Sequence, residues 1–346
     1  MNYRDIIREN CNHRSDVPWW PQFAFHCTDV KNAVNILSSG RLYSRTDAEK
    51  LGIMKNDNAS RQVIDMTMTA AASYARFYFR PLTPTQYHNE GYKHPALRYD
   101  DDKNANMPVP VFFAFDLEKV LETPGAQFSE RAQAGHGAKL FHSVEEFAAL
   151  DFRKIYSNQY DENWQDTIKY RHAELLIPSQ FEIDTCLSAI LCRNHVELLT
   201  LRNLLQQQNP EFFNKYKDRM KICRREMFEN NGLFISDCHF SENTISITFS
   251  DTYAKAKHTR SAMSKKGLTS LSPVQGRLNL RWFNAKQVLC FQTTVENSID
   301  YIHPKAITFE NLPHILDART LRIEFYIEGA LMCCLDYPLS DVELIK

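Results

Sequence analysis

Near Gly232 the hydrophobic pattern of the chain changes, and this change limits the folds that the sequence can adopt. In three runs beyond it, apolar residues alternate with polar ones, which is typical of β strands with one buried face. The apolar members of these runs are Ile245, Ile247, Phe249, Leu278, Leu280, Trp282, Leu321, Ile323, Phe325 and Ile327. We therefore predict a smaller, mostly β domain over residues 232–346 of the 346-residue chain.

A strand followed directly by a helix is predicted near the start of the chain. Gln22 to Thr28 is rich in aromatic residues, and Asp29 has a side chain that commonly caps helix N-termini. The apolar residues that follow at helical spacing are Val30, Ala33, Val34 and Leu37. Gly40 is a typical residue for the end of such a helix. This order places His26 at the end of a strand, next to backbone amides that can receive an anionic group.

Strands and helices are mixed irregularly in the rest of residues 1–231. The predicted strands are Pro108 to Phe115, Glu174 to Ile177 and Leu187 to Cys192. Helices are expected after the capping residues Asp116, Ser143 and Asn194. Residues 45–65, 88–107 and 123–142 are predicted to be mainly loops. Because no regular β-α-β rhythm is present, an α+β fold is favoured over a doubly wound sheet.

The overall charge of the chain is nearly balanced, but the charges are unevenly distributed. Lys and Arg total 41 residues and Asp and Glu total 42, which does not indicate a nucleic-acid-binding protein. Residues 252–295, however, contain no acidic residue and eight Lys or Arg residues. A second basic cluster occupies residues 215–225. Such local clusters can hold a polyanion even when the total charge is neutral.

Several other functional classes are disfavoured by composition. Nine cysteines occur without a CxxC pair, which favours reduced thiols over a disulfide framework. No Cys and His spacing resembles a zinc site, so no metal is predicted. No apolar run has the ~18–20 residues of a membrane helix, and no apolar signal core is present at the start. We expect a soluble, cytoplasmic protein that does not bind a membrane.

Individual residues give weak functional evidence. His26 is by default a hydrogen-bonded structural histidine, and Arg61 is by default a solvated residue of a polar loop. Glu174 is more informative, because it opens an apolar strand and is therefore expected to be partly buried. Carboxylates are seldom buried without a partner or a purpose. A structural ion pair, for example with Arg171, explains Glu174 as well as a catalytic role does.

The combination of motifs is more specific than its parts. In order, the chain contains His26-Cys27-Thr28 with Asn32, then Phe77-Tyr78-Phe79-Arg80-Pro81, then Phe128-Ser129-Glu130-Arg131, and then His172-Ala173-Glu174-Leu175-Leu176. Over roughly residues 22–230 this set resembles the DarT family, NAD-dependent ADP-ribosyltransferase toxins that modify bases of nucleic acid. The resemblance implies an ADP-ribosyltransferase-like split antiparallel sheet with helices. It does not extend to residues 232–346.

The resemblance also implies roles for individual residues. It implies that Glu174 is catalytic and that Arg61, the nearest match to the family's arginine, assists it. The residues that it places at NAD, the ADP-ribose donor, are His26, Cys27, Thr28, Asn32 and Tyr78. It implies no metal. Where the family usually reads PRSP, this chain has Pro81-Leu82-Thr83-Pro84, so Arg80 or Arg76 is expected to replace the missing arginine.

The predicted nucleic-acid contacts follow from the family and from the basic clusters. They are Arg80, Lys215, Lys221, Arg224 and Arg225, expected next to the active site. Tyr253, Trp282 and Phe283 of the acid-free stretch are candidates for extending this track, although a solvated basic face or a protein-binding surface fits equally well. A base inside a duplex cannot reach such a pocket, so the target is expected to be single-stranded. Single-stranded DNA and mRNA both remain possible targets.

The chemistry of ADP-ribosyl transfer explains why these residue types are needed. Cleavage of the nicotinamide–ribose bond passes through an oxocarbenium-like transition state, which a nearby carboxylate stabilises. The expected function is therefore a toxin that ADP-ribosylates single-stranded nucleic acid, with a cognate antitoxin and a role in toxin–antitoxin or phage-defence systems. Two alternatives remain: an ADP-ribosyltransferase that acts on protein, and a non-catalytic nucleic-acid-binding module.

Overall fold

The structure is a computed structural model that describes residues 1–13, 17–55, 71–98, 106–132, 139–159, 162, 164–223 and 226–339. The helices are α1 (Tyr3–His13), α2 (Val30–Ser39), α3 (Arg45–Lys50), α5 (Pro84–Asn89), α6 (Leu117–Leu121), α7 (Val144–Ala148), α8 (Phe152–Ile155), α9 (Trp164–Tyr170), α10 (His195–Gln208), α11 (Pro210–Tyr216) and α12 (Tyr253–Lys265). Short 3-10 helices are η1 (Trp20–Gln22), η2 (Ala71–Ser73), η3 (Pro95–Leu97), η4 (Ile183–Thr185) and η5 (Lys217–Arg219).

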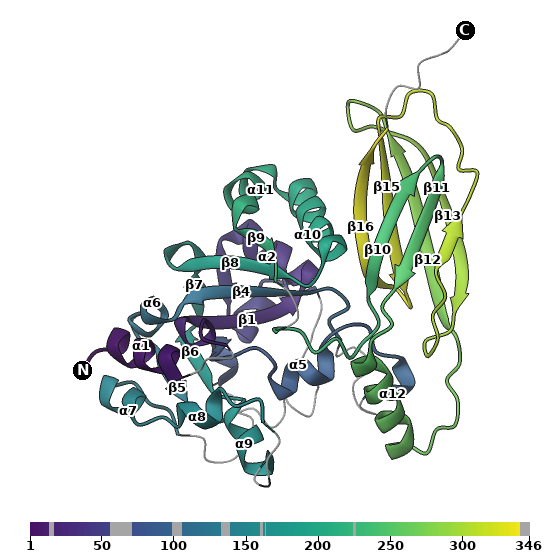
Figure 1. Ribbon diagram of the computed structural model, residues 1–346. Helices are drawn as coiled ribbons and strands as arrows, with labels where there is room; N and C mark the ends of the chain where they lie inside the picture. The colour runs from purple at the N-terminus through teal and green to yellow at the C-terminus, as the bar shows by residue number, and fades with distance from the viewer. Residues whose placement is uncertain are drawn as a thin grey trace.

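The strands fall into two groups along the chain. The first group is β1 (Phe23–Asp29), β2 (Arg41–Tyr43), β3 (Tyr74–Tyr78), β4 (Pro110–Asp116), β5 (Gln127–Ser129), β6 (Glu174–Pro178), β7 (Gln180–Glu182), β8 (Leu187–Cys192) and β9 (Met220–Ile222). The second is β10 (Ile235–Ser241), β11 (Thr244–Phe249), β12 (Val274–Phe283), β13 (Leu289–Ile299), β14 (Ile307–Phe309), β15 (Thr320–Ile327) and β16 (Ala330–Pro338). Figure 1 shows the two groups as separate bodies of the molecule.

A seven-stranded sheet forms the centre of the first body, in the order β5-β6-β3-β1-β4-β8-β9. Its neighbouring strands are antiparallel, except that β8 and β9 run parallel, so the sheet is mixed where the resemblance implied an antiparallel one. β2 and β7 form a separate two-stranded ladder. The α+β fold is confirmed, and β4 is buried along almost its whole length, as expected of a central strand.

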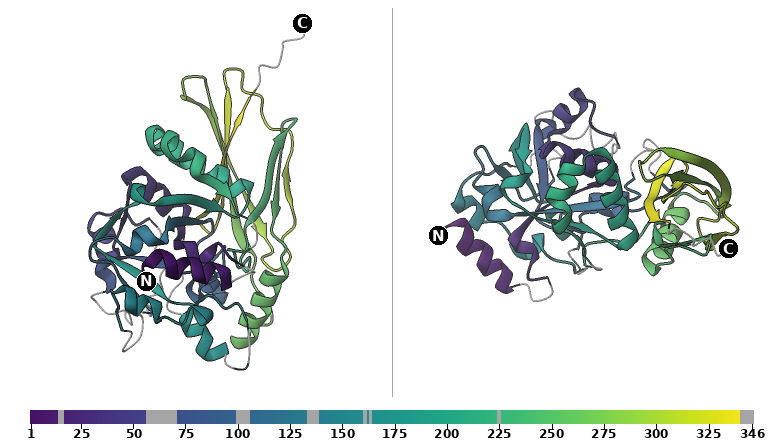
Figure 2. Two further views of the ribbon diagram at one scale, coloured as in Figure 1. Left: turned by 60° about the vertical axis from the view of Figure 1, so that its left-hand side comes forward. Right: turned by 90° about the horizontal axis from the view of Figure 1, so that it is seen from above.

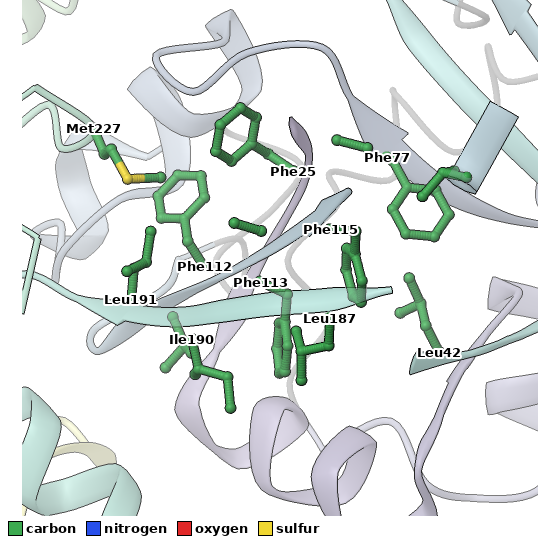
Figure 3. Close-up of a cluster of buried hydrophobic side chains, with 14 of the residues drawn as sticks. Phe25, Leu42, Phe77, Phe112, Phe113, Phe115, Leu187, Ile190, Leu191 and Met227 are labelled. Atoms are coloured by element: carbon green, nitrogen blue, oxygen red, sulfur yellow. The ribbon is translucent and has the colours of Figure 1, made fainter. Parts of the chain in front are cut away.

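Apolar side chains cover both faces of this sheet (Figure 3). In the ladder of β1 and β4, Phe25 faces Ala114 and Cys27 faces Phe112, so Phe25 and Phe112 share one face, whereas Phe113 and Phe115 point to the other. Phe112 packs edge-on against Phe228 at 5.5 Å between ring centroids, and Phe115 packs similarly against Phe77 at 5.3 Å. Burial on both faces explains why β4 reads as a continuous apolar run instead of an alternating one.

The predicted strand–helix unit is present at the start of the sheet. The Asp29 side chain accepts a hydrogen bond from the Lys31 amide and so caps α2, and Gly40 ends the helix at φ 68°. The buried side chains of α2 are the four at the predicted spacing. α2 therefore begins directly where β1 ends, and the last residues of β1 lie beside its N-terminus.

The second body is a β sandwich with one helix. A three-stranded sheet (β10-β11-β14) packs against a four-stranded sheet (β13-β12-β15-β16), and all pairs are antiparallel. Alternate residues of β12 are buried, as the sequence alternation predicts. Helix α12, between β11 and β12, was not predicted. Its sequence is mostly polar and carries no continuous apolar stripe, so hydrophobic spacing did not reveal it.

The two bodies lie side by side (Figure 2), and two backbone segments approach each other closely at the seam between them. A Cβ atom added to Gly232 would lie 2.6 Å from the Glu90 carbonyl oxygen and 2.8 Å from the Gly91 Cα. Only a glycine lets the two chain segments approach so closely. The residue at which the hydrophobic pattern changes is therefore a contact point of the seam.

A buried ionic network adjoins the same contact. Arg193 donates to Glu197 through Nε at 3.1 Å and to Glu90 through Nη1 at 3.1 Å. Glu90 also accepts hydrogen bonds from the backbone amides of Glu229 and Asn230, both at 2.8 Å. Fully paired buried charges of this kind orient the segments that they join.

Within the described ranges, no helix has the length and apolar character needed to span a bilayer.

Candidate active site

The central sheet opens between β1 and β3. β1 pairs with β4 along its whole length, from Phe23 with Asp116 to Asp29 with Pro110. With β3 it forms a single register pair, Phe25 with Tyr78. The two strands then diverge, and a cavity of about 230 Å³ lies beside the gap. Its lining residues come from β1, α2, β2, α3, the segment that follows α3, and β3: His26, Cys27, Thr28, Asn32, Asn35, Ile36, Leu42, Tyr43, Arg45, Ala48, Ile53, Met54, Tyr74 and Arg76.

His26 bridges the opening with its side chain. Its Nδ1 lies 3.0 Å from the backbone carbonyl oxygen of Arg76. A carbonyl can only accept, so Nδ1 carries the proton, and the neutral ring has its acceptor lone pair on Nε2. Burial lowers the pKa of His26 to about 4, which keeps the ring neutral at physiological pH. His26 can therefore accept a hydrogen bond from a hydroxyl group in the cavity.

The other predicted NAD contacts of this strand and helix also line the cavity. Asn32 donates to the buried Thr28 hydroxyl at 3.4 Å and accepts a hydrogen bond from the Lys55 amide at 2.8 Å. Asn35, on the same face of α2, donates to the Ile53 carbonyl at 2.6 Å. These amides fix residues 53–55 over the cavity. Burial raises the pKa of the Cys27 thiol well above its ordinary value, so Cys27 is a neutral wall residue and not a nucleophile.

Glu174 lies across the opening, on β6, and is held by Arg76. Nε and Nη2 of Arg76 donate to the Glu174 carboxylate at 2.9 Å and 2.7 Å. The carboxylate is 1% exposed, whereas the Arg76 side chain is 28% exposed and lines the cavity. Burial disfavours the charged guanidinium, but Glu174 outweighs it and holds the pKa of Arg76 above its ordinary value. The pair is thus ionised, with Arg76 between the carboxylate and the cavity.

The ion pair differs from the one suggested by the sequence. Arg171 donates to the Gln159 carbonyl at 2.9 Å, and the partner of Glu174 is Arg76. The strand geometry explains this, because β3 places Tyr74, Arg76 and Tyr78 on one face. Tyr78 is the register partner of Glu174, so Arg76 reaches the carboxylate from the diagonal position.

Tyr78 completes the site next to the carboxylate. Burial, followed by the charge of Glu174, raises the pKa of the Tyr78 phenol, so the hydroxyl stays protonated. Glu174 faces Ser129 of β5 on its other side. Tyr78 is therefore adjacent to the catalytic candidate, although it is not among the residues that line the cavity.

Several cavity residues were not identified as site residues from the sequence, and Arg45 and Tyr74 are two of them. Arg45, the first residue of α3, lines the cavity and forms an ion pair with Glu49 at 2.9 Å. Tyr74 lines it from β3. The alternation Tyr74-Ala75-Arg76-Phe77-Tyr78 would have predicted a strand with its polar residues on one face, but the aromatic density of the segment obscured that period.

The predicted role of Arg80 in nucleic-acid binding is wrong. Its guanidinium is fully buried and lies over the Trp20 ring. It donates to the backbone carbonyls of Pro81 at 2.8 Å, Ile155 at 3.0 Å and Ser157 at 2.7 Å. A guanidinium enclosed in this way cannot reach a phosphate. Arg80 instead ties the end of β3 to the segment after α8.

The predicted basic cluster lies at a distance from the site. Lys221 is exposed on β9, the edge strand opposite β5, and five strand spacings of ~4.8 Å separate β9 from β6, or ~24 Å. Lys215 lies on α11 and pairs with Asp184 at 2.5 Å. The expectation that Lys221 adjoins Glu174 is therefore wrong. Arg61, Arg224 and Arg225 lie outside the described residues.

Together, the described residues combine a buried carboxylate, a guanidinium, a protonated phenol and a neutral imidazole around one opening in the sheet. A carboxylate fixed by two N–H donors is suited to stabilise a cationic carbon or to accept a proton. A guanidinium beside it is suited to bind phosphate oxygens. This set fits chemistry at the anomeric carbon of a sugar that carries a phosphate group.

Comparison with known proteins points to the same chemistry. A family model described as "ssDNA thymidine ADP-ribosyltransferase, DarT" matches residues 25–228, which is more than half of the chain. No curated protein matches significantly. The match covers the central sheet and its helices and ends before β10.

Solved structures with detectable similarity carry the same family name. Thermus sp. 2.9 DarT in complex with ADP-ribosylated ssDNA is 18% identical, with 60% of this chain and 95% of that chain covered and a TM-score of 0.48. The NAD+ complex of the same protein is 18% identical, with 60% and 96% covered and a TM-score of 0.45. Thermosipho africanus DarTG in complex with ADP-ribose is 14% identical, with 56% and 51% covered and a TM-score of 0.40.

Proposed function

The chain belongs to the DarT family and is an NAD-dependent ADP-ribosyltransferase, and we propose that it transfers ADP-ribose from NAD onto thymidine in single-stranded DNA. The observation that carries this proposal is the position of Glu174, held by Arg76 at the opening of the sheet beside the His26 cavity. The family description supplies the acceptor, single-stranded thymidine.

Glu174 has two tasks in this reaction. Cleavage of the bond between nicotinamide and the ribose anomeric carbon builds positive charge on the sugar, which the carboxylate stabilises. A new bond then forms between that carbon and the thymine base, and the base loses a proton. Glu174 accepts this proton, so the balance is one NAD consumed and one nicotinamide and one proton released.

Arg76 and His26 position the donor. The contacts of Arg76 to Glu174 use Nε and Nη2, which leaves Nη1 for a pyrophosphate oxygen of NAD. His26 accepts a hydrogen bond from a ribose hydroxyl through Nε2. Tyr78 provides a protonated aromatic wall beside the carboxylate. These contacts hold the sugar in one orientation, which lowers the entropic cost of the reaction.

We propose a single-stranded acceptor because the Glu174 carboxylate is buried. The carboxylate is buried beside Arg76, so the base has to leave any helical stack before it can react. Discrimination between DNA and RNA depends on contacts to the 2′-hydroxyl. We propose DNA because the family description names it.

We also propose that the chain is a toxin with a neutralising partner. A bulky ADP-ribose group on a template base blocks base pairing, so uncontrolled transfer harms the cell that makes the enzyme. Expression of the wild-type chain is therefore expected to arrest growth, and expression of Glu174→Gln is expected to be tolerated. Equal toxicity of the two proteins would contradict this role.

The function is tested by incubating the full-length protein with NAD labelled in its adenylate phosphate. The acceptors, each supplied alone, are a thymidine-containing single strand, the same strand with every thymidine replaced by cytidine, its duplex, an RNA of matching sequence, and total protein. We expect label on the thymidine-containing single strand, and none when Glu174→Gln is used.

Other labelling patterns would overturn the proposal in defined ways. Label on RNA alone would replace the acceptor, and label on total protein alone would indicate a protein-directed transferase. Label on the thymidine-free strand would replace the base. Intact NAD with no label on any acceptor would indicate a binding module.

A further inference from the structure

A second cavity, of about 150 Å³, lies in the seam between the two bodies. It is formed by α5, the segment 93–98 that includes η3, and helix α12, which Figure 1 shows beside α5. The basic side chains at its wall are Lys93, Arg98, Lys265, Lys266, His88 and His258. Among its described lining residues there is no aspartate or glutamate.

Helix α12 presents a complete face to this cavity. His258, Ser261, Ala262 and Lys265 line it at positions i, i+3, i+4 and i+7, which is the spacing of one helical stripe. On the other wall, the Tyr87 ring of α5 lies edge-on to His258, with 5.4 Å between centroids. The residues of the acid-free stretch thus meet the first body at this point and contribute a cationic wall.

The deepest cation of the cavity is Lys93, which is 1% exposed. Its Nζ donates to the Asn231 side-chain oxygen, a neutral acceptor. Burial lowers the pKa of Lys93 to about 7, although the nearby carboxylates of Glu90 and Glu229 act in the opposite direction. A buried ammonium group held by a neutral partner is stabilised further by an anion placed in the cavity.

His258 supplies a buried polar atom that lacks a partner among the described residues. Its Nδ1 is buried and has no hydrogen-bond partner among the described residues. Burial and the neighbouring Lys93 and His88 lower the pKa of the ring to about 3, so it is neutral. A neutral imidazole can place its N–H on either nitrogen and donate it to an oxyanion.

The cavity lies close to the catalytic residues. Burial is the main cause of the lowered pKa of His258 and of His172, and the charge of His88, on α5, adds to it in both, so His88 lies near both rings. His172 precedes Glu174 by two residues and lies near Arg76. The hydroxyl of Tyr78 is hydrogen-bonded to Thr85 of α5. Helix α5 therefore connects the catalytic carboxylate to the cationic cavity.

The size of the cavity restricts the ligand. About 150 Å³ is roughly five times the ~30 Å³ that one water molecule occupies in the liquid. A single phosphate group fits this space. Cations that converge in a cavity with no carboxylate among its described lining residues form a pattern that nucleic-acid backbones bind.

We propose that this cavity binds one backbone phosphate of the single-stranded acceptor, so that the C-terminal body takes part in substrate binding. The inference rests on the proposed function for the identity of the strand. It also assigns a specific role to part of the acid-free stretch. Trp282, by contrast, is buried in the sandwich, so it cannot stack on a base.

The test uses Lys265→Glu in the full-length protein, with Arg260→Glu as the matched control. Lys265 is exposed on α12 and lines the cavity, whereas Arg260 is exposed on the same helix but does not line it. Arg260 lies about 140° away around the helix, since each residue turns it by ~100°. Both substitutions reverse one charge, and the melting temperature of each variant reports whether its fold is retained.

Binding of a fluorescent thymidine-containing oligonucleotide is measured by anisotropy without NAD, over a series of salt concentrations. We expect Lys265→Glu to weaken binding about 10-fold and to reduce the salt slope by ~0.7, the value for one phosphate contact of a single strand. Arg260→Glu is expected to change the affinity by less than about twofold. Unchanged binding in Lys265→Glu, or an equal loss in both variants, would overturn the inference.

A free anion carries the same phosphate group as a nucleic-acid strand. Inorganic phosphate and AMP therefore test whether the cavity binds a free anion instead. If either raises the melting temperature of the wild type but not of Lys265→Glu, while both proteins bind the oligonucleotide equally, the cavity binds a free anion and the strand assignment is wrong. Because binding is measured without NAD, the inference can hold even if the wild type labels no nucleic acid. A wild type that labels no nucleic acid would overturn the proposed function but not this inference.

Discussion

The two cavities of this protein differ in how their charges are balanced. At the opening between β1 and β3, the buried carboxylate Glu174 is matched by the guanidinium of Arg76. In the seam, four Lys or Arg side chains and two histidines meet, and no carboxylate is among the described lining residues. The first arrangement suits a reaction in which positive charge develops at one atom. The second suits the binding of a group that is already negative.

Each cavity contains a neutral histidine, and in each the pKa of the ring is lowered mainly by burial. His26 and His258 both have lowered pKa values, about 4 and about 3, with burial as the largest cause in each. In the first cavity the ring bridges a gap in a sheet, whereas in the second it lies between two bodies of the chain. Burial at an opening in a sheet and burial at the interface of two bodies therefore both keep an imidazole neutral.

The largest effect is expected at Glu174. Glu174→Gln keeps the volume of the side chain but removes the negative charge and replaces one acceptor oxygen by an NH2 donor. We expect the rate of transfer from labelled NAD to fall by ~10²–10⁴-fold, because both charge stabilisation and proton acceptance are lost. Calorimetry should show NAD affinity within about threefold of the wild type. A transfer rate near that of the wild type would remove Glu174 from the catalytic centre.

The next largest effect is expected on stability, at Arg76. Arg76→Ala leaves a carboxylate that is 1% exposed without its charged partner, so the free energy of unfolding should fall by ~3 kcal/mol. Arg76→Lys restores one charge but not the two-armed contact, and should recover part of that loss. Urea unfolding at pH 7 measures both. A free energy of unfolding for Arg76→Ala equal to that of the wild type would show that the ion pair does not stabilise the fold.

A pH effect is expected from the histidines of both cavities. The unfolded chain protonates a histidine near pH 6.5, whereas the folded chain does so near pH 4 for His26 and near pH 3 for His258. The unfolded state therefore binds more protons between these values. The stability that each neutral histidine contributes is present above pH 6.5 and is lost progressively as the pH falls to about 4 for His26 and about 3 for His258.

Variants of these histidines measure the effect. His26→Asn and His258→Asn should each reduce the slope of the unfolding free energy between pH 6 and pH 5 by about 1.4 kcal/mol per pH unit, the value for one proton. Urea unfolding at several pH values gives these slopes. An unchanged slope in one variant, with a reduced slope in the other, would show that only one cavity keeps its histidine neutral.

The smallest effect is expected at the far edge of the sheet. Lys221 on β9 is ~24 Å from β6, so Lys221→Glu should change the affinity for a short thymidine oligonucleotide by less than about twofold. Lys265→Glu, measured in parallel, is expected to reduce it about 10-fold. If Lys221→Glu has the larger effect, the strand follows the edge of the central sheet and not the seam.

Much of the local structure was predictable from the sequence. The strand and helix around His26 were found because a capping Asp29, a 3.6-residue spacing and a closing Gly40 agree with one another. The strands of the sandwich were found from alternation. The mostly polar helix α12 was missed, since its residues are placed by the contact with α5 and η3 and not by an apolar stripe.

The candidate site was predictable in part. The resemblance indicated His26, Thr28 and Asn32, which line one cavity, and Glu174 across the opening from them. It did not indicate Arg76 as the partner of Glu174, because the two residues are 98 positions apart and meet only through strand pairing. It placed Arg80 on nucleic acid, although the fold encloses that guanidinium.

By itself, the sequence determined the family, the mixed architecture of the first body and the change of pattern at Gly232, because periodicity, capping and motif order are local properties of a chain. Only the tertiary structure decided which cation faces Glu174, which lysines are distant from it, and which basic residues converge in the seam. These choices depend on strand order and interdomain packing, and the contacts that set them join residues far apart in the chain.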